Sequence, residues 1–239
     1  MQPAADQPEP RTPRRPWVVG VSGASGTPYA ASVLRALLAA GESVDLVVSR
    51  ASRLTLLDET GIAFRDAHWR DDLRTWLARG ADGKPETFAA DVRALGDLGD
   101  VRYWAAGDLA AGPSSGSYAT KGMLIVPAST ACVAGVALGL SKDLLQRAAS
   151  VTLKESRRLV VAVRETPLNG QTLRHLVTLD QAGAVIAPAS PAFYAGATHI
   201  QDLVDFVAGR VLDAAGVEHG LYRRWAGELG SGHTDPGDS

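Results

Sequence analysis

Short apolar runs alternate with longer amphipathic stretches along most of the chain, beginning at Trp17. Short runs rich in Val, Leu and Ile are typical of buried parallel strands, and the amphipathic stretches between them are typical of the helices that cover such a sheet. The pattern predicts strands at 17–21, 44–48, 101–105, 123–126, 159–163 and 184–186. It predicts helices at 27–40, 50–60, 71–79, 144–157, 173–182 and 200–215. The expected fold class is therefore α/β, with a mostly parallel sheet between helices.

The predicted elements form one domain, residues 17–226, because no internal repeat or linker divides them. Residues 1–16 are rich in proline and charge, a mixture that cannot bury enough apolar surface to fold, and are predicted to be a disordered tail. Residues 227–239, rich in Gly, Asp and Ser, are predicted to be a flexible C-terminal tail. Residues 64–100 lack clean periodicity beyond one short helix, and no function is assigned to them.

Composition favours a small-molecule ligand. The formal charge is −2 and both signs are scattered, so no basic stripe is available for a nucleic acid or an anionic membrane. No run approaches the roughly 20 apolar residues that span a bilayer. Cys132 is the single cysteine and cannot form an intramolecular disulfide, so nothing points to an oxidising compartment and a cytoplasmic protein is expected.

The turn between the first strand and the first helix reads Ser-Gly-Ala-Ser-Gly, from Ser22 through Gly23 and Ala24 to Gly26. Such a turn presents backbone N–H groups and the positive end of a helix to an anion, so it is a candidate phosphate cradle. The alternative is that the glycines serve only the tight turn, as they do in proteins that bind nothing there.

The spacing of this turn limits the ligand. Gly20, Gly23 and Gly26 do not form the G-x-G-x-x-G dinucleotide fingerprint, and the second strand ends in Ser49 instead of an acidic residue that would hold a ribose. The glycine-lysine loop of nucleoside-triphosphate sites is also missing. A mononucleotide such as FMN is therefore favoured over NAD.

Other predicted strands also end in polar residues: Ser49, the pair Ser129-Thr130, and the pair Arg164-Glu165. Ligands of open α/β sheets collect at the carboxyl ends of the strands, so these residues are candidates for one site. Ser49 or Ser129 taken singly would be interpreted as a helix cap. Their convergence with Ser22 is what favours a binding site.

Arg147 and Lys154 lie seven residues apart on one predicted helix, so they share a face and could hold one anionic group between them. A solvated helix face explains the pair equally well. Cys132 has no histidine in its loop to act as a base and is interpreted as a core residue. The histidines show no metal-ligand spacing, and no metal site is predicted.

Taken in order, a set of short motifs resembles those of the UbiX-type flavin prenyltransferases. The resemblance spans about residues 17–225 and lapses through 64–100. The motifs are Val21–Gly26, Ser49, Asp58–Thr60, Ser115–Ser117, Pro127–Thr130, Arg147, Leu153–Glu155, Arg164–Pro167 and Pro191–Tyr194.

The resemblance implies a Rossmann-like (flavodoxin-like) three-layer fold with helices on both faces of the sheet. It implies an enzyme that joins a dimethylallyl group from dimethylallyl phosphate to reduced FMN, without a metal. The product, prenylated FMN, would serve a UbiD-like decarboxylase. It further implies a homo-oligomer, a dodecamer in the family, with the flavin between subunits.

The same resemblance implies roles for individual residues. Those that would hold FMN are Ser22, Gly23, Ala24, Ser49, Ser129, Thr130, Ala131, Cys132 and Arg164. Those that would hold the phosphate of the prenyl donor are Lys154, Tyr194 and Arg210. Those implied in catalysis are Ser22, Glu59, Arg147, Lys154 and Glu165. The residue types suit the chemistry, because cations stabilise a departing phosphate, a carboxylate can move a proton and an aromatic face favours an allylic cation.

Two positions depart from the family pattern. Many relatives have Gly or Lys and then Thr where this chain has Ala131-Cys132, and some have an aromatic residue at the position of Leu109. These departures leave open an FMN-binding or flavin-delivery protein without prenyl transfer. A related flavin-dependent cysteine decarboxylase is a second alternative, although the histidine expected near the second strand and helix of that class is not in this sequence.

Overall fold

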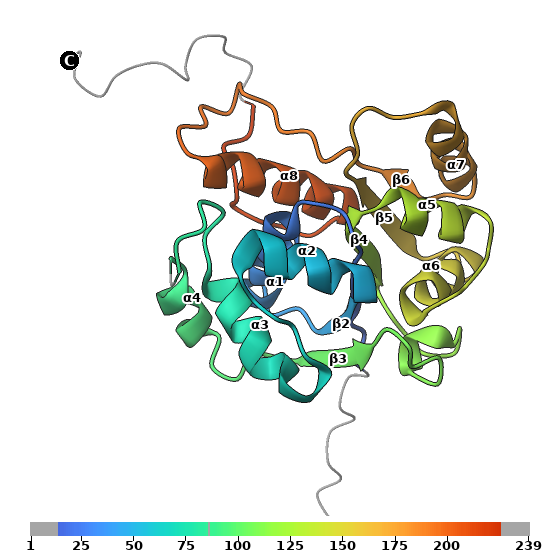
Figure 1. Ribbon diagram of the computed structural model, residues 1–239, viewed down its shortest axis with the longest axis horizontal. Helices are drawn as coiled ribbons and strands as arrows, with labels where there is room; N and C mark the ends of the chain where they lie inside the picture. The colour runs from blue at the N-terminus through green and yellow to red at the C-terminus, as the bar shows by residue number, and fades with distance from the viewer. Residues whose placement is uncertain (1–13, 86, 226–239) are drawn as a thin grey trace, which may run out of the picture.

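The computed structural model describes residues 14–85 and 87–225 and contains one sheet flanked by helices (Figure 1). Its strands are β1 (Trp17–Val21), β2 (Val44–Val48), β3 (Val101–Ala105), β4 (Gly122–Ala128), β5 (Arg158–Val163) and β6 (Val185–Ile186). The order across the sheet is β3-β2-β1-β4-β5-β6, and every adjacent pair is parallel. This is the strand order of doubly wound nucleotide-binding folds, whose direction of winding reverses between β1 and β4.

The helices form the two outer layers. They are α1 (Thr27–Ala39), α2 (Arg50–Thr60), α3 (Trp69–Ala78), α4 (Ala89–Ala94), α5 (Thr130–Ala137), α6 (Leu144–Lys154), α7 (Gly170–Gln181) and α8 (Ile200–Ala215). Short 3-10 turns occupy Asp66–His68 and Gly112–Ser114. In the described ranges, none of the helices is long and apolar enough to cross a membrane.

Two hydrophobic clusters lie on opposite faces of the sheet. Neighbouring strand residues point to opposite faces, so Val19 belongs to the cluster under α1, α2, α3 and α8, whereas Val18 belongs to the cluster under α5, α6 and α7. Strands β1, β2 and β4 are buried along their whole length, which is why they appear in the sequence as continuous apolar runs. The predicted three-layer α/β fold is confirmed.

The element bounds differ from the sequence prediction mainly at helix ends. Helix α7 begins at Gly170 instead of residue 173, because the Asn169 side chain caps it by accepting from the N–H of Thr172. Helix α6 ends at Lys154 instead of residue 157, because Ser156 adopts a left-handed conformation with φ of 53°. Helix α4, within the stretch that lacked periodicity, was not predicted.

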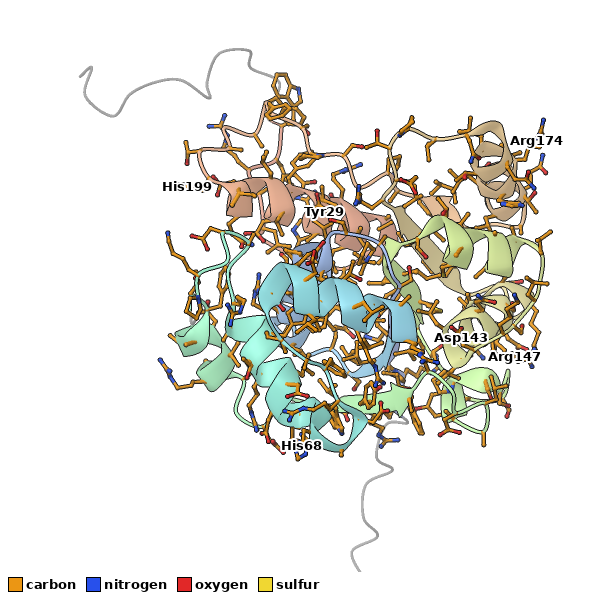
Figure 2. The ribbon with its side chains drawn as sticks, in the orientation of Figure 1. Tyr29, His68, Asp143, Arg147, Arg174 and His199 are labelled. Carbon is orange, nitrogen blue, oxygen red and sulfur yellow. The ribbon has the colours of Figure 1, made fainter. Side chains whose placement is uncertain are left out.

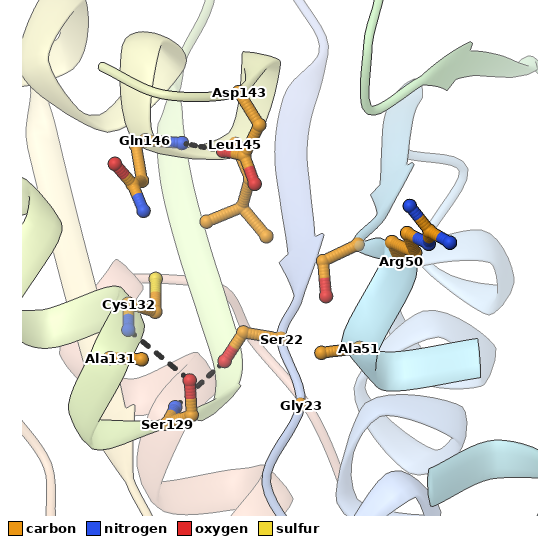
Figure 3. A pocket seen from close by; sticks show the side chains of 11 residues that line it. Ser22, Gly23, Arg50, Ala51, Ser129, Ala131, Cys132, Asp143, Leu145 and Gln146 are labelled. Carbon is orange, nitrogen blue, oxygen red and sulfur yellow. Dashed lines mark hydrogen bonds between the residues drawn. The ribbon is translucent and has the colours of Figure 1, made fainter. Parts of the chain in front are cut away.

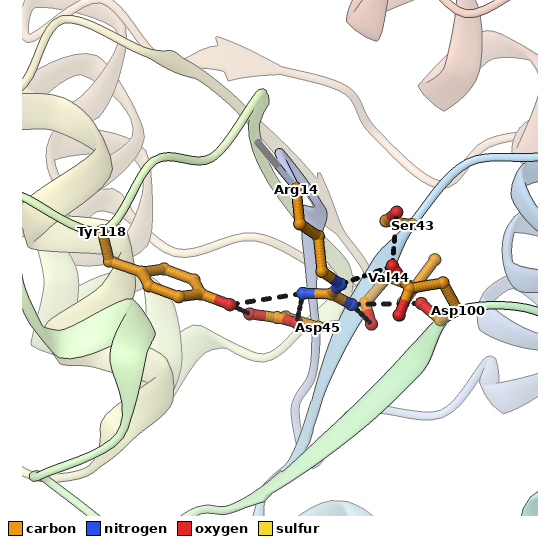
Figure 4. A network of polar contacts seen from close by, with 6 residues as sticks. All are labelled: Arg14, Ser43, Val44, Asp45, Asp100 and Tyr118. Atoms are coloured by element: carbon orange, nitrogen blue, oxygen red, sulfur yellow. Dashed lines mark hydrogen bonds and ion pairs between the residues drawn. The ribbon is translucent and has the colours of Figure 1, made fainter. Parts of the chain in front are cut away.

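Arg14 is held in a polar network although it lies in the stretch predicted to be disordered (Figure 4). Its guanidinium donates to Asp45 at 2.6 Å and pairs with Asp100, and the hydroxyl of Tyr118 donates to Asp45 at 2.9 Å. The Asp45 side chain is fully buried, and these partners replace the water that it has lost. Arg14 therefore belongs to the packed structure, and the predicted tail, residues 1–16, extends too far along the chain. Residues 1–13, and the predicted tail at 227–239, lie outside the described residues.

Candidate active site

A cavity of about 240 Å³ opens at the point where the winding of the sheet reverses (Figure 3). Its walls come from the turn between β1 and α1 and from the starts of α2, α5 and α6. The lining residues are Ser22, Gly23, Ser49, Arg50, Ala51, Ser129, Ala131, Cys132, Asp143, Leu145 and Gln146. The first three of these segments follow the carboxyl ends of β1, β2 and β4, the edge where parallel α/β sheets bind ligands. The predicted convergence of Ser22, Ser49 and Ser129 is therefore found in the structure.

Two helices begin at this cavity with serine caps. The Ser49 side chain accepts from the N–H of Ser52 at 3.1 Å, and the Ser129 side chain accepts from the N–H of Cys132 at 3.2 Å. The remaining first-turn N–H groups of a helix have no partner within the helix, and each helix start carries partial positive charge. Two such starts beside one hollow fit a phosphate group. The capping and binding interpretations of these serines are therefore compatible.

Gly23 sets the distance between the turn that joins β1 to α1 and the start of α2. A Cβ atom at this position would lie 2.5 Å from the Cβ atom of Ala51. The turn can pack against the start of α2 only because position 23 has no side chain. The neighbouring Ala24 is buried in the same turn.

The hydroxyl of Ser22 joins the ends of two strands. It donates to the carbonyl of Pro127 at 2.9 Å and accepts from the N–H of Ser129 at 2.7 Å, and the residue is buried. Ser22 thereby fixes the start of α5 relative to β1. Nothing in the local sequence pattern indicated this contact, because the partners are more than 100 residues away along the chain.

The carboxylate of Glu59 caps α1 from a neighbouring helix. It accepts from the N–H groups of Gly26 and Thr27, both at 2.8 Å, and from the Thr27 hydroxyl at 2.6 Å. Helix α1 has no cap of its own, because its N-cap residue is Gly26. Partial burial acts to raise the pKa of Glu59, but hydrogen bonds from Ser25, Thr27 and Gly26 outweigh it and lower the pKa below its usual value. Glu59 does not line the cavity.

The two charged residues after β5 differ in their surroundings. The Nε atom of Arg164 donates to the carbonyl of Ser25 at 3.1 Å, so this predicted FMN residue contacts the turn that begins at Ser22. Glu165 is exposed and accepts from the N–H of Thr166 at 3.0 Å. Both lie at the carboxyl edge of the sheet with the cavity, as predicted.

Arg147 and Lys154 face the loop that contains Gly112–Ser114. The Nε atom of Arg147 donates to the carbonyl of Ser114 at 3.1 Å, and a Cβ atom on Gly116 would lie 2.6 Å from the Nζ atom of Lys154. Lys154 itself pairs with Glu155. The predicted shared face is therefore present, and it packs along this loop.

Lys154 lies far from the cavity in the same chain. An α-helix rises about 1.5 Å per residue, so Lys154 at the end of α6 is about 12 Å along the helix from Gln146, which lines the cavity. Arg210 lies on α8, which covers the opposite face of the sheet. In Figure 2, Arg147 on α6 and His199 before α8 stand on opposite sides of the molecule. Within one chain, Lys154 and Arg210 therefore lie on helices that cover opposite faces of the sheet, and their assignment to one phosphate stays a prediction.

Tyr194 and Arg210 belong to the α8 side of the molecule. The Tyr194 ring lies edge-on to Phe206 of α8, with ring centroids 5.7 Å apart, and is half exposed. Arg210 is exposed and pairs with Asp213 one turn along the helix. These two predicted donor residues thus share one surface, whereas Lys154 does not.

Cys132 is buried, as predicted for a core residue. Burial raises the pKa of its thiol to about 12, and the charge of Asp143 acts in the same direction. Its backbone N–H donates to the Ser129 side chain, and the residue lines the cavity. Among the residues that the structure describes, no group of three or more His, Cys, Asp or Glu side chains could hold a metal ion.

Known proteins are similar in sequence to this chain over most of its length. The sequence profile of the family described as Flavoprotein matches residues 5–212. The flavin prenyltransferase UbiX of Streptomyces coelicolor is 87% identical over 215 residues, which cover 90% of this chain and 97% of that protein. The chain belongs to the flavin prenyltransferase UbiX family. Its Pseudomonas aeruginosa member is 34% identical over 87% of this chain and 92% of its own length.

Solved structures of this family share the fold. AnUbiX (PadA1), solved in complex with FMN and dimethylallyl pyrophosphate, superimposes with a TM-score of 0.74 at 36% identity and covers 91% of this chain and 100% of its own. A dodecameric FMN-dependent UbiX-like decarboxylase from Escherichia coli O157:H7 superimposes with a TM-score of 0.71 at 34% identity, covering 88% and 99%. The family resemblance predicted from the motifs is confirmed.

Proposed function

We propose that this chain transfers a dimethylallyl group from dimethylallyl phosphate to reduced FMN and so forms prenylated FMN. The observation that carries the proposal is the pair of helix starts, at Ser49 and Ser129, that face one cavity beside the turn at Ser22. Free N–H groups at two positive helix ends suit the phosphate of a mononucleotide. Reduced FMN, when bound, supplies the electron-rich ring to which the prenyl group is joined.

The binding residues divide between the main chain and a few side chains. Around FMN, the proposed groups are the backbone of the 22–24 turn, the helix starts at 49 and 129–132, and the side chain of Arg164. Gly23 supports this assignment, because its missing side chain lets the turn approach α2 closely.

The charged residues outside the cavity act on the prenyl donor. Departure of a phosphate is favoured by cations that stabilise its growing charge, a role suited to Arg147, Lys154 and Arg210. Glu165 is exposed at the sheet edge, where its carboxylate can take or give a proton. The ring of Tyr194 offers an aromatic face to an allylic cation.

The separation of Lys154 from Arg210 supports a homo-oligomer. Because α6 and α8 cover opposite faces of the sheet, one phosphate can contact both residues only if they come from different copies of the chain. The related decarboxylase from Escherichia coli is dodecameric. We infer a dodecamer here, with donor sites completed between subunits.

The product has a further destination. We infer that prenylated FMN passes to a UbiD-like decarboxylase. We also infer that the reaction takes place in the cytoplasm, because a chain with a single cysteine can form no intramolecular disulfide and shows no sign of an oxidising compartment. Residues 17–226 are inferred to form the catalytic domain without a metal.

The test is an anaerobic incubation of the full chain with reduced FMN and dimethylallyl phosphate, followed by mass spectrometry of the flavin. We expect the flavin to gain one five-carbon unit, and a reaction without donor is the control. If neither the monophosphate nor the pyrophosphate donor gives this gain, the proposed activity is wrong. Tight FMN binding without the gain would instead indicate a flavin-binding or flavin-delivery protein.

A further inference from the structure

Asp213, in the last turn of α8, gathers four side chains around one carboxylate. Its Oδ2 atom accepts from Arg210 at 3.0 Å and from the hydroxyl of Tyr222. Its Oδ1 atom accepts from Arg224 at 2.8 Å and contacts the Nε2 atom of His219 at 3.1 Å. The Asp213 side chain is only 18% exposed, so it has lost most of its contact with water. Its four partners replace that water with charge-assisted hydrogen bonds.

Three of these partners belong to the segment 217–225, which follows α8. Gly216 ends the helix in a left-handed conformation, and the chain then returns along the helix surface. A Cβ atom at Gly209 would lie 2.5 Å from the ring of Tyr222 and 2.7 Å from His219. The returning segment therefore packs directly on the helix backbone, at the residue before Arg210.

The network controls how Arg210 presents its donors. Only the Nη1 atom is engaged, by Asp213 and, at 3.4 Å, by Tyr222. Within residues 14–85 and 87–225, the Nε and Nη2 atoms have no hydrogen-bond partner, and the side chain is 58% exposed. A guanidinium fixed at one nitrogen keeps the planar fork of the other two available for a phosphate oxygen pair.

The returning segment also reaches the second donor residue on this surface. Trp225 lies edge-on to Tyr194, with ring centroids 5.7 Å apart, and Tyr194 lies edge-on to Phe206 of α8. Arg224, the residue before Trp225, is one of the groups that Asp213 holds. The Asp213 carboxylate thus connects the placement of Arg210 with that of Trp225, the ring beside Tyr194.

We propose that Asp213 is a positioning residue of the donor site: it holds Nη1 of Arg210 and the segment 217–225, so that Arg210 presents its free nitrogens to the phosphate of dimethylallyl phosphate. The inference rests on the proposed function, because it assigns the donor phosphate to the surface of Arg210. Asp213 itself does not touch the donor. Its loss is expected to weaken donor binding and to slow departure of the phosphate, because Arg210 acts on both, while FMN binding remains.

The test compares Asp213→Asn with Asp72→Asn in the full-length, FMN-loaded protein. Asp72 is a matched control, because it is also a little-exposed carboxylate that pairs with an arginine of 58% exposure, Arg65, on a different surface. We expect Asp213→Asn to raise the KM for dimethylallyl phosphate about tenfold and to lower kcat by a smaller factor, with the KM for reduced FMN within about twofold of wild type. Calorimetric titration with dimethylallyl phosphate should show the same loss of affinity.

Two results would overturn the role of Asp213. One is an unchanged KM and unchanged donor affinity in Asp213→Asn. The other is a joint rise in the KM values for donor and FMN, which would indicate a general structural role. If Asp213→Asn does not fold, Tyr222→Phe decides, because it removes one hydroxyl of the network and keeps the ring; we expect about a threefold rise in the donor KM, and an unchanged value contradicts the proposal.

The proposed function and this inference fail in different ways. A wild-type protein that forms no prenylated flavin contradicts the proposed function, whereas the titration still measures donor binding by itself. A wild-type protein that forms the product, together with an Asp213→Asn variant of wild-type donor affinity, contradicts only the inference.

Discussion

Glu59 holds Thr27 by two hydrogen bonds, one from its backbone N–H and one from its hydroxyl. The contact joins the end of α2 to the start of α1, 32 residues earlier in the chain. It fixes the turn between β1 and α1, where the proposed FMN site begins. A residue that the family resemblance places in catalysis therefore has a clear structural task.

Replacing Glu59 by Ala should destabilise the fold and weaken FMN binding together. Loss of a helix cap typically lowers the free energy of unfolding by about 1 kcal/mol, and the released turn would no longer be held beside the cavity. Urea unfolding and flavin fluorescence titration measure the two effects. The control is Asp58→Asn on the same helix, an exposed neighbour that should leave both unchanged. Full FMN affinity in a destabilised Glu59→Ala protein would show that the cap does not support the site.

The contribution of Asp213 to stability should disappear in acid. Its partial burial acts to raise the pKa, but hydrogen bonds from Tyr222, Arg224 and His219 lower it to about 2, against about 3.9 in an unfolded chain. A lowered folded-state pKa gives stability that is complete above about pH 4 and is lost as the pH falls toward 2. The stability difference between wild type and Asp213→Asn, from urea unfolding, should therefore be larger at pH 7 than at pH 3. A difference independent of pH would contradict this assignment.

Two variants should separate FMN binding from prenyl transfer. Lys154→Ala and Glu165→Gln change residues that do not line the cavity, so we expect both proteins to purify with FMN yet lose at least about a hundredfold in turnover. Gly23→Ala provides the contrast, because its added methyl group would meet Ala51 at 2.5 Å and should reduce FMN binding itself. Absorbance of the bound flavin and the mass-spectrometric assay read the two properties. If Lys154→Ala or Glu165→Gln purified without flavin, the division of the site would be wrong.

Removing the side chain of Arg14 should destabilise the protein strongly. Asp45 is fully buried, and a buried carboxylate that loses its cation costs about 3 kcal/mol or more. Arg14→Ala should therefore unfold at lower urea concentration than Arg15→Ala, which changes an exposed neighbour. Adding Asp45→Asn to Arg14→Ala should recover part of the loss, because it removes the unpaired charge. No recovery in the double variant would show that packing, not charge, dominates at this position.

The sequence by itself determined all six strands, most of the helices and the family. Buried parallel strands need continuous apolar runs, so all six strands were predicted near their observed positions. Local capping is also a short-range signal, which is why Ser49 and Ser129 could be interpreted both as caps and as site residues. The short motifs were specific enough in combination to identify the family before any fold was known.

Only the tertiary structure decided which distant residues meet. Glu59 caps α1, Arg14 reaches Asp45, and Ser22 joins Pro127, although none of these pairs is close in sequence. Periodicity and caps depend on near neighbours, whereas such contacts depend on the strand order and on the face to which each helix packs. The placement of Lys154 and Arg210 has the same cause: the family resemblance assigned both to one phosphate, and their helices pack on opposite faces of the sheet.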